Sequence, residues 1–107
     1  MVTYCFDLDG TLCTQNGMDY DSATALSERV QEVSRLFDLG HEIIIFTARG
    51  SGTGIDHEDL TRFQLASWGV KFNKLIFGKP AADFYVDDKA VHSDDFKWNS
   101  AKNGSFT

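Results

Sequence analysis

Carboxylates, a hydroxyl and two basic side chains follow four apolar segments of the chain, and together these groups could transfer a phosphoryl group. The residues are Asp7, Asp9, Thr47, Arg49, Lys79, Asp87 and Asp88. One carboxylate can attack phosphorus and hold the group as an aspartyl-phosphate, while a second carboxylate transfers protons. Carboxylate oxygens also suit Mg²⁺, and lysine and threonine side chains can bind phosphate oxygens.

Each of these groups follows a short segment that is predicted to be a strand. The predicted strands cover residues 2–6, 43–46, 74–77 and 83–86. The run at 43–46 is continuously apolar, which is typical of a strand covered on both faces of a sheet. Cys5 lies inside the first strand and is interpreted as a small core residue.

Helices are predicted between the strands. Asp21 is a favourable N-cap for the first helix, where apolar residues recur at helical spacing until Gly40. The second helix runs from about residue 57 to residue 68 and ends at Gly69. Alternating strands and helices predict an α/β fold with a parallel sheet. The carboxyl ends of parallel strands lie at one edge, so the candidate residues are expected to gather there.

Size and charge limit the possible functions. The chain has 107 residues, enough for one domain, with 42% apolar and 24% charged residues. Its net charge of −6 argues against a nucleic-acid partner, because DNA and RNA are normally bound by basic surfaces. The longest apolar run is the one at 43–46, so no membrane span is expected. No segment has the pattern of a signal peptide, and we expect a cytoplasmic protein.

Four motifs resemble those of the haloacid dehalogenase superfamily, in the same order. Asp7-Leu8-Asp9-Gly10-Thr11 resembles the first motif, DxDGT, and residues 43–47 resemble the second, an apolar strand that ends in threonine. Lys79 resembles the lysine of the third motif, and Asp87-Asp88 resembles the paired acids of the fourth. The resemblance extends over residues 3–88.

The resemblance implies a role for each motif residue. Asp7 would be the nucleophile and a Mg²⁺ ligand, and Asp9 the general acid and base that also offers its backbone carbonyl to the metal. Thr47 and Lys79 would bind the phosphoryl group. Asp87 would complete the metal shell, and Asp88 would support it from outside.

The resemblance also implies the architecture, a Rossmann-like three-layer sandwich around a central parallel sheet. The segments 12–20 and 49–58 are too short to fold as cap domains, so a minimal capless core is expected. The domain would cover residues 1–98, followed by a polar, disordered tail at 99–107. The site would be open, shielded only by loops or by a second copy of the chain.

A narrower resemblance points to a substrate. Residues 47–50, 78–80 and 85–90 resemble small bacterial phosphatases of capsule and surface-polysaccharide biosynthesis, which implies a sugar or polyol phosphate. The alternatives are a phosphatase acting on a nucleic-acid end or a phosphoprotein, and a non-catalytic binding module.

Some site residues keep two interpretations. Arg49 either binds the substrate phosphate or pairs with a nearby acid. The loop at residues 50–54 is interpreted as an entrance loop, since it lacks the phosphate-binding GxxxxGK[ST] pattern. His57 follows that loop and either contacts substrate or has no functional role.

Overall fold

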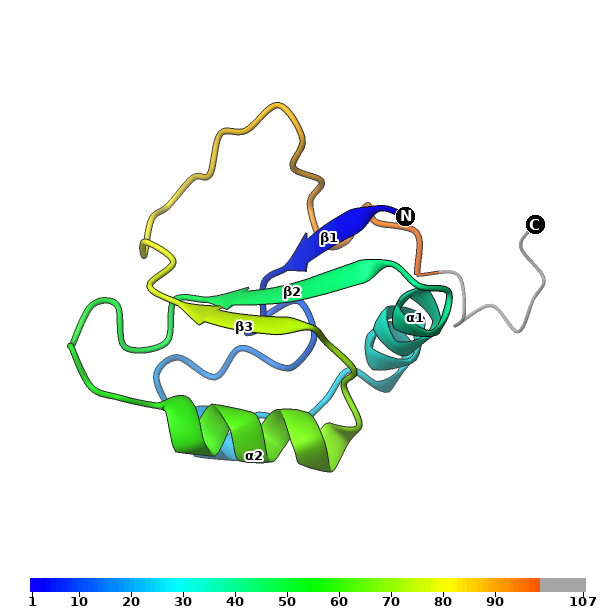
Figure 1. Cartoon of the computed structure of the whole chain (residues 1–107). Coiled ribbons are helices and arrows are strands. Elements are labelled where there is room, and N and C mark those ends of the chain that lie inside the picture. Colours follow the sequence, from blue (N-terminus) through cyan, green and yellow to red (C-terminus); the bar gives the residue numbers. More distant parts are fainter. Residues whose placement is uncertain (99–107) are drawn as a thin grey trace.

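The computed structural model describes residues 1–98, and the predicted tail at 99–107 lies outside the described residues. The elements follow in the order β1 (Thr3–Phe6), η1 (Tyr20–Ser22), α1 (Ser27–Asp38), β2 (Glu42–Thr47), α2 (Glu58–Trp68) and β3 (Lys74–Phe77). The strands form one parallel sheet in the order β1-β2-β3 (Figure 1). The predicted α/β class with a central parallel sheet and a minimal core is confirmed, and residues 1–98 contain no separate cap domain.

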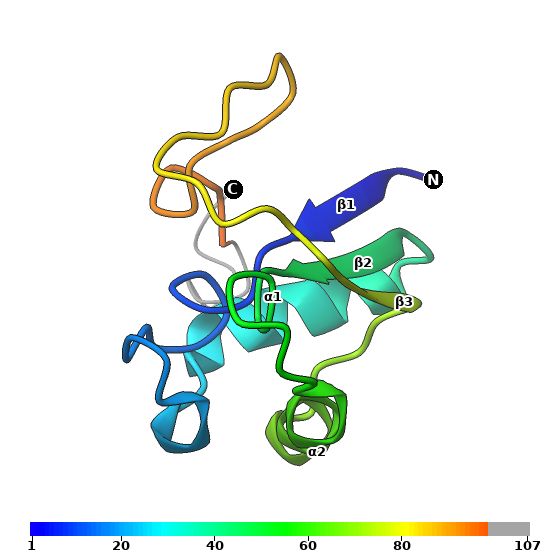
Figure 2. The ribbon, with the colours of Figure 1, turned by 90° about the vertical axis from the view of Figure 1, so that its left-hand side faces the viewer.

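Both helices lie on the same side of the sheet, as the two views agree (Figures 1 and 2). The strand register places Phe6, Ile45 and Leu75 in one row across that face. Ile45 is fully buried there, and it belongs to the same core as Leu65 of α2 and Val33 of α1. Burial of this face against the helices is what orders the sheet.

The opposite face of the sheet is less covered than the sequence predicted. Cys5 is exposed there, Ile44 and Phe46 are half-buried, and Ile76 is 42% exposed. Among residues 1–98 no helix covers this face (Figure 2). The core position predicted for Cys5 is therefore wrong, because alternate residues of a strand point to opposite faces.

The bounds of α2 match the prediction at both ends, whereas the beginning of α1 does not. Helix α1 begins at Ser27 rather than just after Asp21, because residues 20–22 form a separate 3₁₀ turn. Ala25 is not helical either, since it bridges Cys13. Helix α2 ends at Gly69 as predicted. No helix within residues 1–98 has the length and apolarity needed to cross a membrane.

The predicted fourth strand does not form. Residues 83–86 are irregular, and within them Phe84 is 85% and Val86 97% exposed. A strand needs a neighbouring strand for its backbone hydrogen bonds, and this segment instead arches away from the sheet (Figure 1). The chain then returns to β1, where the rings of Phe96 and Trp98 pack on Phe6 with centroids 5.6 and 5.7 Å away.

Candidate active site

A tight turn after β1 positions the first two acids. The backbone N–H groups of Thr11 and Leu12 both donate to the carbonyl oxygen of Leu8, at 3.1 and 2.8 Å. The Leu8 side chain is fully buried, which anchors the turn in the core. Asp7 and Asp9 flank this anchor, so their positions are fixed by the packing of the residue between them.

Asp7 lies beside a lysine and a hydroxyl. Its Oδ1 atom is 3.2 Å from Nζ of Lys79, and its Oδ2 atom accepts a hydrogen bond from the Thr11 hydroxyl at 3.4 Å. The Asp7 side chain remains 33% exposed, so a reactant can approach it. The structure thus brings Asp7 and Lys79 together, although they are far apart in the sequence.

Lys79 is placed by its backbone as well as by its charge. Its N–H donates to the carbonyl of Thr47, the last residue of β2, at 3.1 Å. The Ser51 hydroxyl donates to the Lys79 carbonyl at 2.7 Å, and the ammonium lies 4.4 Å from the centroid of the Tyr85 ring. These contacts explain how a lysine on an irregular segment reaches the end of β1.

Thr47 is joined to this cluster through its backbone carbonyl, which accepts the hydrogen bond from the Lys79 N–H. Its side chain is almost fully buried, and its hydroxyl oxygen accepts a hydrogen bond from the Arg49 backbone N–H at 3.1 Å. That bond uses a lone pair and leaves the hydroxyl hydrogen free to donate. The Thr47 hydroxyl therefore keeps a hydrogen to donate, in a nearly fully buried side chain at the end of β2.

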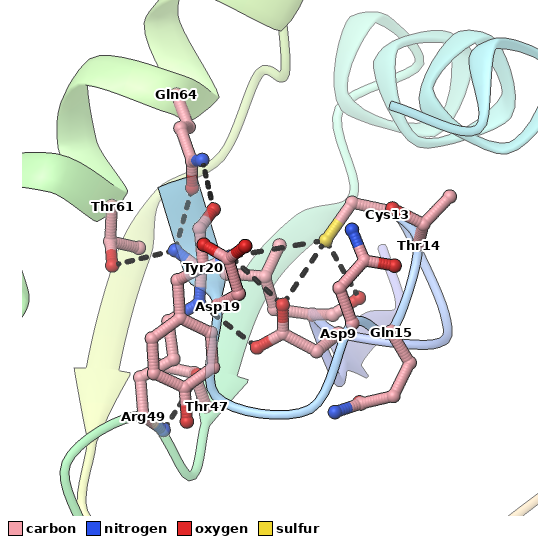
Figure 3. Close-up of polar contacts among 12 residues, drawn as sticks. Asp9, Cys13, Thr14, Gln15, Asp19, Tyr20, Thr47, Arg49, Thr61 and Gln64 are labelled. Carbon is pink, nitrogen blue, oxygen red and sulfur yellow. Dashed lines mark hydrogen bonds and ion pairs between the residues drawn. The ribbon is translucent and has the colours of Figure 1, made fainter. Parts of the chain in front are cut away.

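Asp9 is paired with Arg49 in a two-pronged ion pair (Figure 3). Nε of Arg49 donates to Oδ2 of Asp9 at 2.9 Å, and Nη2 donates to Oδ1 at 2.8 Å. The Cys13 thiol also donates to Oδ1, at 3.4 Å. Arg49 therefore pairs with a nearby acid, Asp9, which is one of its two predicted interpretations.

Helix α2 and η1 hold the other side of Arg49 (Figure 3). Nη1 donates to Oγ1 of Thr61 at 3.1 Å and to Oε1 of Gln64 at 2.6 Å, and the guanidinium lies 4.7 Å from the Tyr20 ring centroid. Burial lowers the pKa of Arg49, but the hydrogen bonds and charge of Asp9 outweigh it and raise that pKa overall.

Sequence reasoning missed the residues that surround Arg49. Thr61 and Gln64 are three positions apart on α2, and both are buried although polar. Polar side chains at helical spacing on a face that also buries Leu65 are the signal that could have identified them. The contact of Tyr20 with Arg49 joins segments far apart in the chain, and no local pattern encodes it.

The predicted magnesium ligands do not converge in this conformation. Asp7 and Asp9 follow β1, whereas Asp87 and Asp88 lie in the exposed segment after β3. Residues 1–98 contain no group of three or more His, Cys, Asp or Glu side chains that could hold a metal ion. The Lys89 backbone N–H bonds Asp87 at 2.8 Å and, together with Asp88, lowers the pKa of Asp87. As arranged, these donors do not fit a divalent ion.

The loop between β2 and α2 borders a small open pocket that Arg49 also lines. The pocket has a volume of about 180 Å³ and is lined by Gly50, His57 and Phe77 among others. The Nε2 atom of His57 is buried without a hydrogen-bond partner among residues 1–98. The His57 ring packs edge-on against the Tyr20 ring, with the ring centroids 4.8 Å apart. The loop at 50–54 thus borders the candidate site, as its interpretation as an entrance loop requires.

Comparisons with known proteins identify the fold. Protein-family models and curated proteins both give no match to this chain. Among solved structures, an MCSG target from Vibrio cholerae matches with a TM-score of 0.79 and 26% identity, over 96% of this chain and 95% of that one.

Two further solved structures are similar over part of their length. The Pnkp1/Rnl/Hen1 complex matches with a TM-score of 0.58 and 23% identity, over 80% of this chain and 30% of that one. A D,D-heptose 1,7-bisphosphate phosphatase from B. bronchiseptica, complexed with magnesium and phosphate, matches with a TM-score of 0.55 and 21% identity. That match covers 78% of this chain and 53% of the phosphatase chain. At such identities the likeness is one of fold, and this chain shares the fold of these solved structures.

Proposed function

We propose that this chain is a phosphatase that hydrolyses phosphate monoesters with Asp7 as the nucleophile. The observation that carries the proposal is the contact of Asp7 with Lys79 at 3.2 Å, at the end of β1 and beside Thr47. A partly exposed carboxylate next to a cation and a hydroxyl donor suits attack on an anionic phosphoryl group.

The reaction has two displacements at phosphorus. An oxygen of Asp7 attacks phosphorus, the ester oxygen leaves with its electron pair, and Asp9 gives that oxygen a proton. Asp9 then takes a proton from water, which attacks phosphorus, so that inorganic phosphate leaves and the Asp7 carboxylate is restored. Lys79 and Thr47 donate hydrogen bonds to the phosphate oxygens throughout.

Magnesium dependence is part of the proposal. Bound Mg²⁺ would neutralise charge between the acids and the phosphate. The heptose bisphosphate phosphatase with a similar fold was crystallised with magnesium and phosphate, which supports the same metal here. Asp87 would have to come closer to Asp7 than it lies in this conformation, because the two acids are in separate segments.

The proposed substrate is a small sugar or polyol phosphate, of the kind used in capsule and surface-polysaccharide biosynthesis. A similar fold acts on a heptose bisphosphate, which supports a phosphorylated sugar. The net charge of −6 also favours a small substrate over a long polyanion.

A second candidate is a phosphatase acting on the end of a nucleic acid. The match to the Pnkp1/Rnl/Hen1 RNA repair complex favours it, and so does a site without a cap domain, which would admit a large substrate. The acidic charge of the chain weighs against this candidate, so it stands second.

The test is phosphate release with Mg²⁺ from an aryl phosphate, a panel of sugar phosphates and a 3′-phosphorylated oligonucleotide. Asp7→Asn is expected to abolish release while the circular dichroism spectrum stays unchanged. Asp59→Asn is the matched control, because Asp59 is an exposed acid in the first turn of α2. Equal turnover by Asp7→Asn and the wild type would refute the proposal, and the preferred substrate decides between the two candidates.

A further inference from the structure

All the hydrogen-bond donors of the Arg49 side chain are already engaged (Figure 3). A guanidinium has five N–H groups. Nε and one N–H of Nη2 bind Asp9, and the two N–H groups of Nη1 bind Thr61 and Gln64. The last N–H of Nη2 is directed at Sγ of Cys13, 4.0 Å away, and the side chain is fully buried. Arg49 therefore has no donor left for a substrate phosphate.

The two oxygens of the Asp9 carboxylate accept different numbers of hydrogen bonds. Its Oδ1 atom accepts hydrogen bonds from Nη2 of Arg49 and from the Cys13 thiol, whereas within residues 1–98 the Oδ2 atom accepts only from Nε of Arg49. Burial and the Asp9 charge raise the pKa of Cys13 to about 12, so its thiol stays a neutral donor. Oδ2 keeps a free lone pair, and the side chain is 13% exposed.

We propose that Arg49 is a positioning residue, which orients Asp9 so that Oδ2 is the oxygen that exchanges protons with the leaving group and with water. The inference rests on the proposed phosphatase function and assigns Arg49 no contact with the substrate. A two-pronged arginine–carboxylate pair fixes both the position and the plane of the carboxylate, which a single hydrogen bond does not.

The position of Arg49 is set in turn by helix α2 and η1. Thr61 and Gln64 hold Nη1 from the helix, and Nε2 of Gln64 donates to the Tyr20 carbonyl at 2.7 Å. The Tyr20 ring covers the guanidinium face. A change at Thr61 should therefore reach Asp9 through Arg49, even though Thr61 itself does not bond Asp9.

The experiment compares two phosphate esters that differ in the leaving group. An alkyl alcohol needs a proton in order to leave, whereas an acidic phenol leaves well as its anion. The value of kcat/KM reports the step in which the ester bond breaks. If Arg49 positions Asp9, Arg49→Lys should lower kcat/KM about ten- to a hundredfold for the alkyl ester and far less for the aryl ester. Arg62→Lys, at an exposed arginine of α2, should change neither value.

Thr61→Val is measured alongside, because it removes one hydrogen bond to Arg49 and leaves the ion pair with Asp9 in place. Thr61→Val should also lower kcat/KM more for the alkyl ester than for the aryl ester, but by a smaller factor. If circular dichroism shows that Arg49→Lys is not folded, Thr61→Val provides the test. An equal fall on both esters, or no fall on the alkyl ester in a folded variant, overturns the inference. If the wild type with Mg²⁺ cleaves neither ester, the proposed function fails instead.

Discussion

Gly50 begins the loop between Arg49 and α2, and its backbone φ of 83° lies in the left-handed region that favours glycine. A Cβ atom at this position would also collide with the carbonyl oxygen of Ile55. Two other glycines of the same loop provide controls. Gly54 has a φ of 74°, and a Cβ added there would meet no atom within 4 Å. Gly52 does not have a positive φ, and a Cβ added there would also meet no atom within 4 Å.

This geometry predicts a graded series of alanine substitutions. Gly52→Ala should leave the free energy of unfolding unchanged or raise it by about 0.4–1 kcal/mol, because alanine restricts the unfolded chain. Gly54→Ala should lower it by about 1–2 kcal/mol, the cost of a left-handed alanine. Gly50→Ala has the same strain and a collision with backbone, which adds about 1–3 kcal/mol.

The assay is urea unfolding followed by circular dichroism for the wild type and the three variants. The expected order of stability is Gly52→Ala, then Gly54→Ala, then Gly50→Ala. Phosphatase activity should fall in the same order. The loop helps to hold Lys79, because the Ser51 hydroxyl donates to the Lys79 carbonyl at 2.7 Å. If Gly50→Ala is as stable as Gly54→Ala, the reasoning about the close approach to Ile55 is refuted.

Three further predictions concern the site and the sheet. Lys79→Met should lower kcat/KM by roughly a hundred- to a thousandfold, because it removes a charged donor at Asp7, while the exposed control Lys71→Met should have no effect. In the folded protein at about pH 8, a maleimide should label exposed Cys5 and spare Cys13, whose pKa is about 12; rapid labelling of both would contradict the described burial. Asp87→Asn should raise the Mg²⁺ concentration needed for half-maximal activity, measured by titration after treatment with EDTA, and an unchanged titration would remove Asp87 from the metal site.

Local patterns predicted the strands of the sheet and the end of α2. The apolar run at 43–46 and the glycine at position 69 specify a strand and a helix end by themselves. The beginning of α1 was not predictable from spacing, because a 3₁₀ turn and the pairing of Ala25 with Cys13 compete with the helix there.

The tertiary arrangement of residues near the site was less predictable. The convergence of Asp7, Thr47 and Lys79 follows from the rule that parallel strands end at one edge. The partners of Arg49 did not follow from that rule, since they come from a helix face and a 3₁₀ turn. Residues 83–86 pair with no strand of the sheet, and their side-chain pattern alone does not encode whether a strand finds a partner.

The measurement that tests the central claim most directly is mass spectrometry of the enzyme quenched with acid during turnover with Mg²⁺ and an aryl phosphate. The account predicts a phosphoryl group on the peptide that contains Asp7, absent when substrate is omitted and absent in Asp7→Asn. Steady turnover with no phosphoryl group on that peptide in the wild type, or with undiminished turnover in Asp7→Asn, would contradict it.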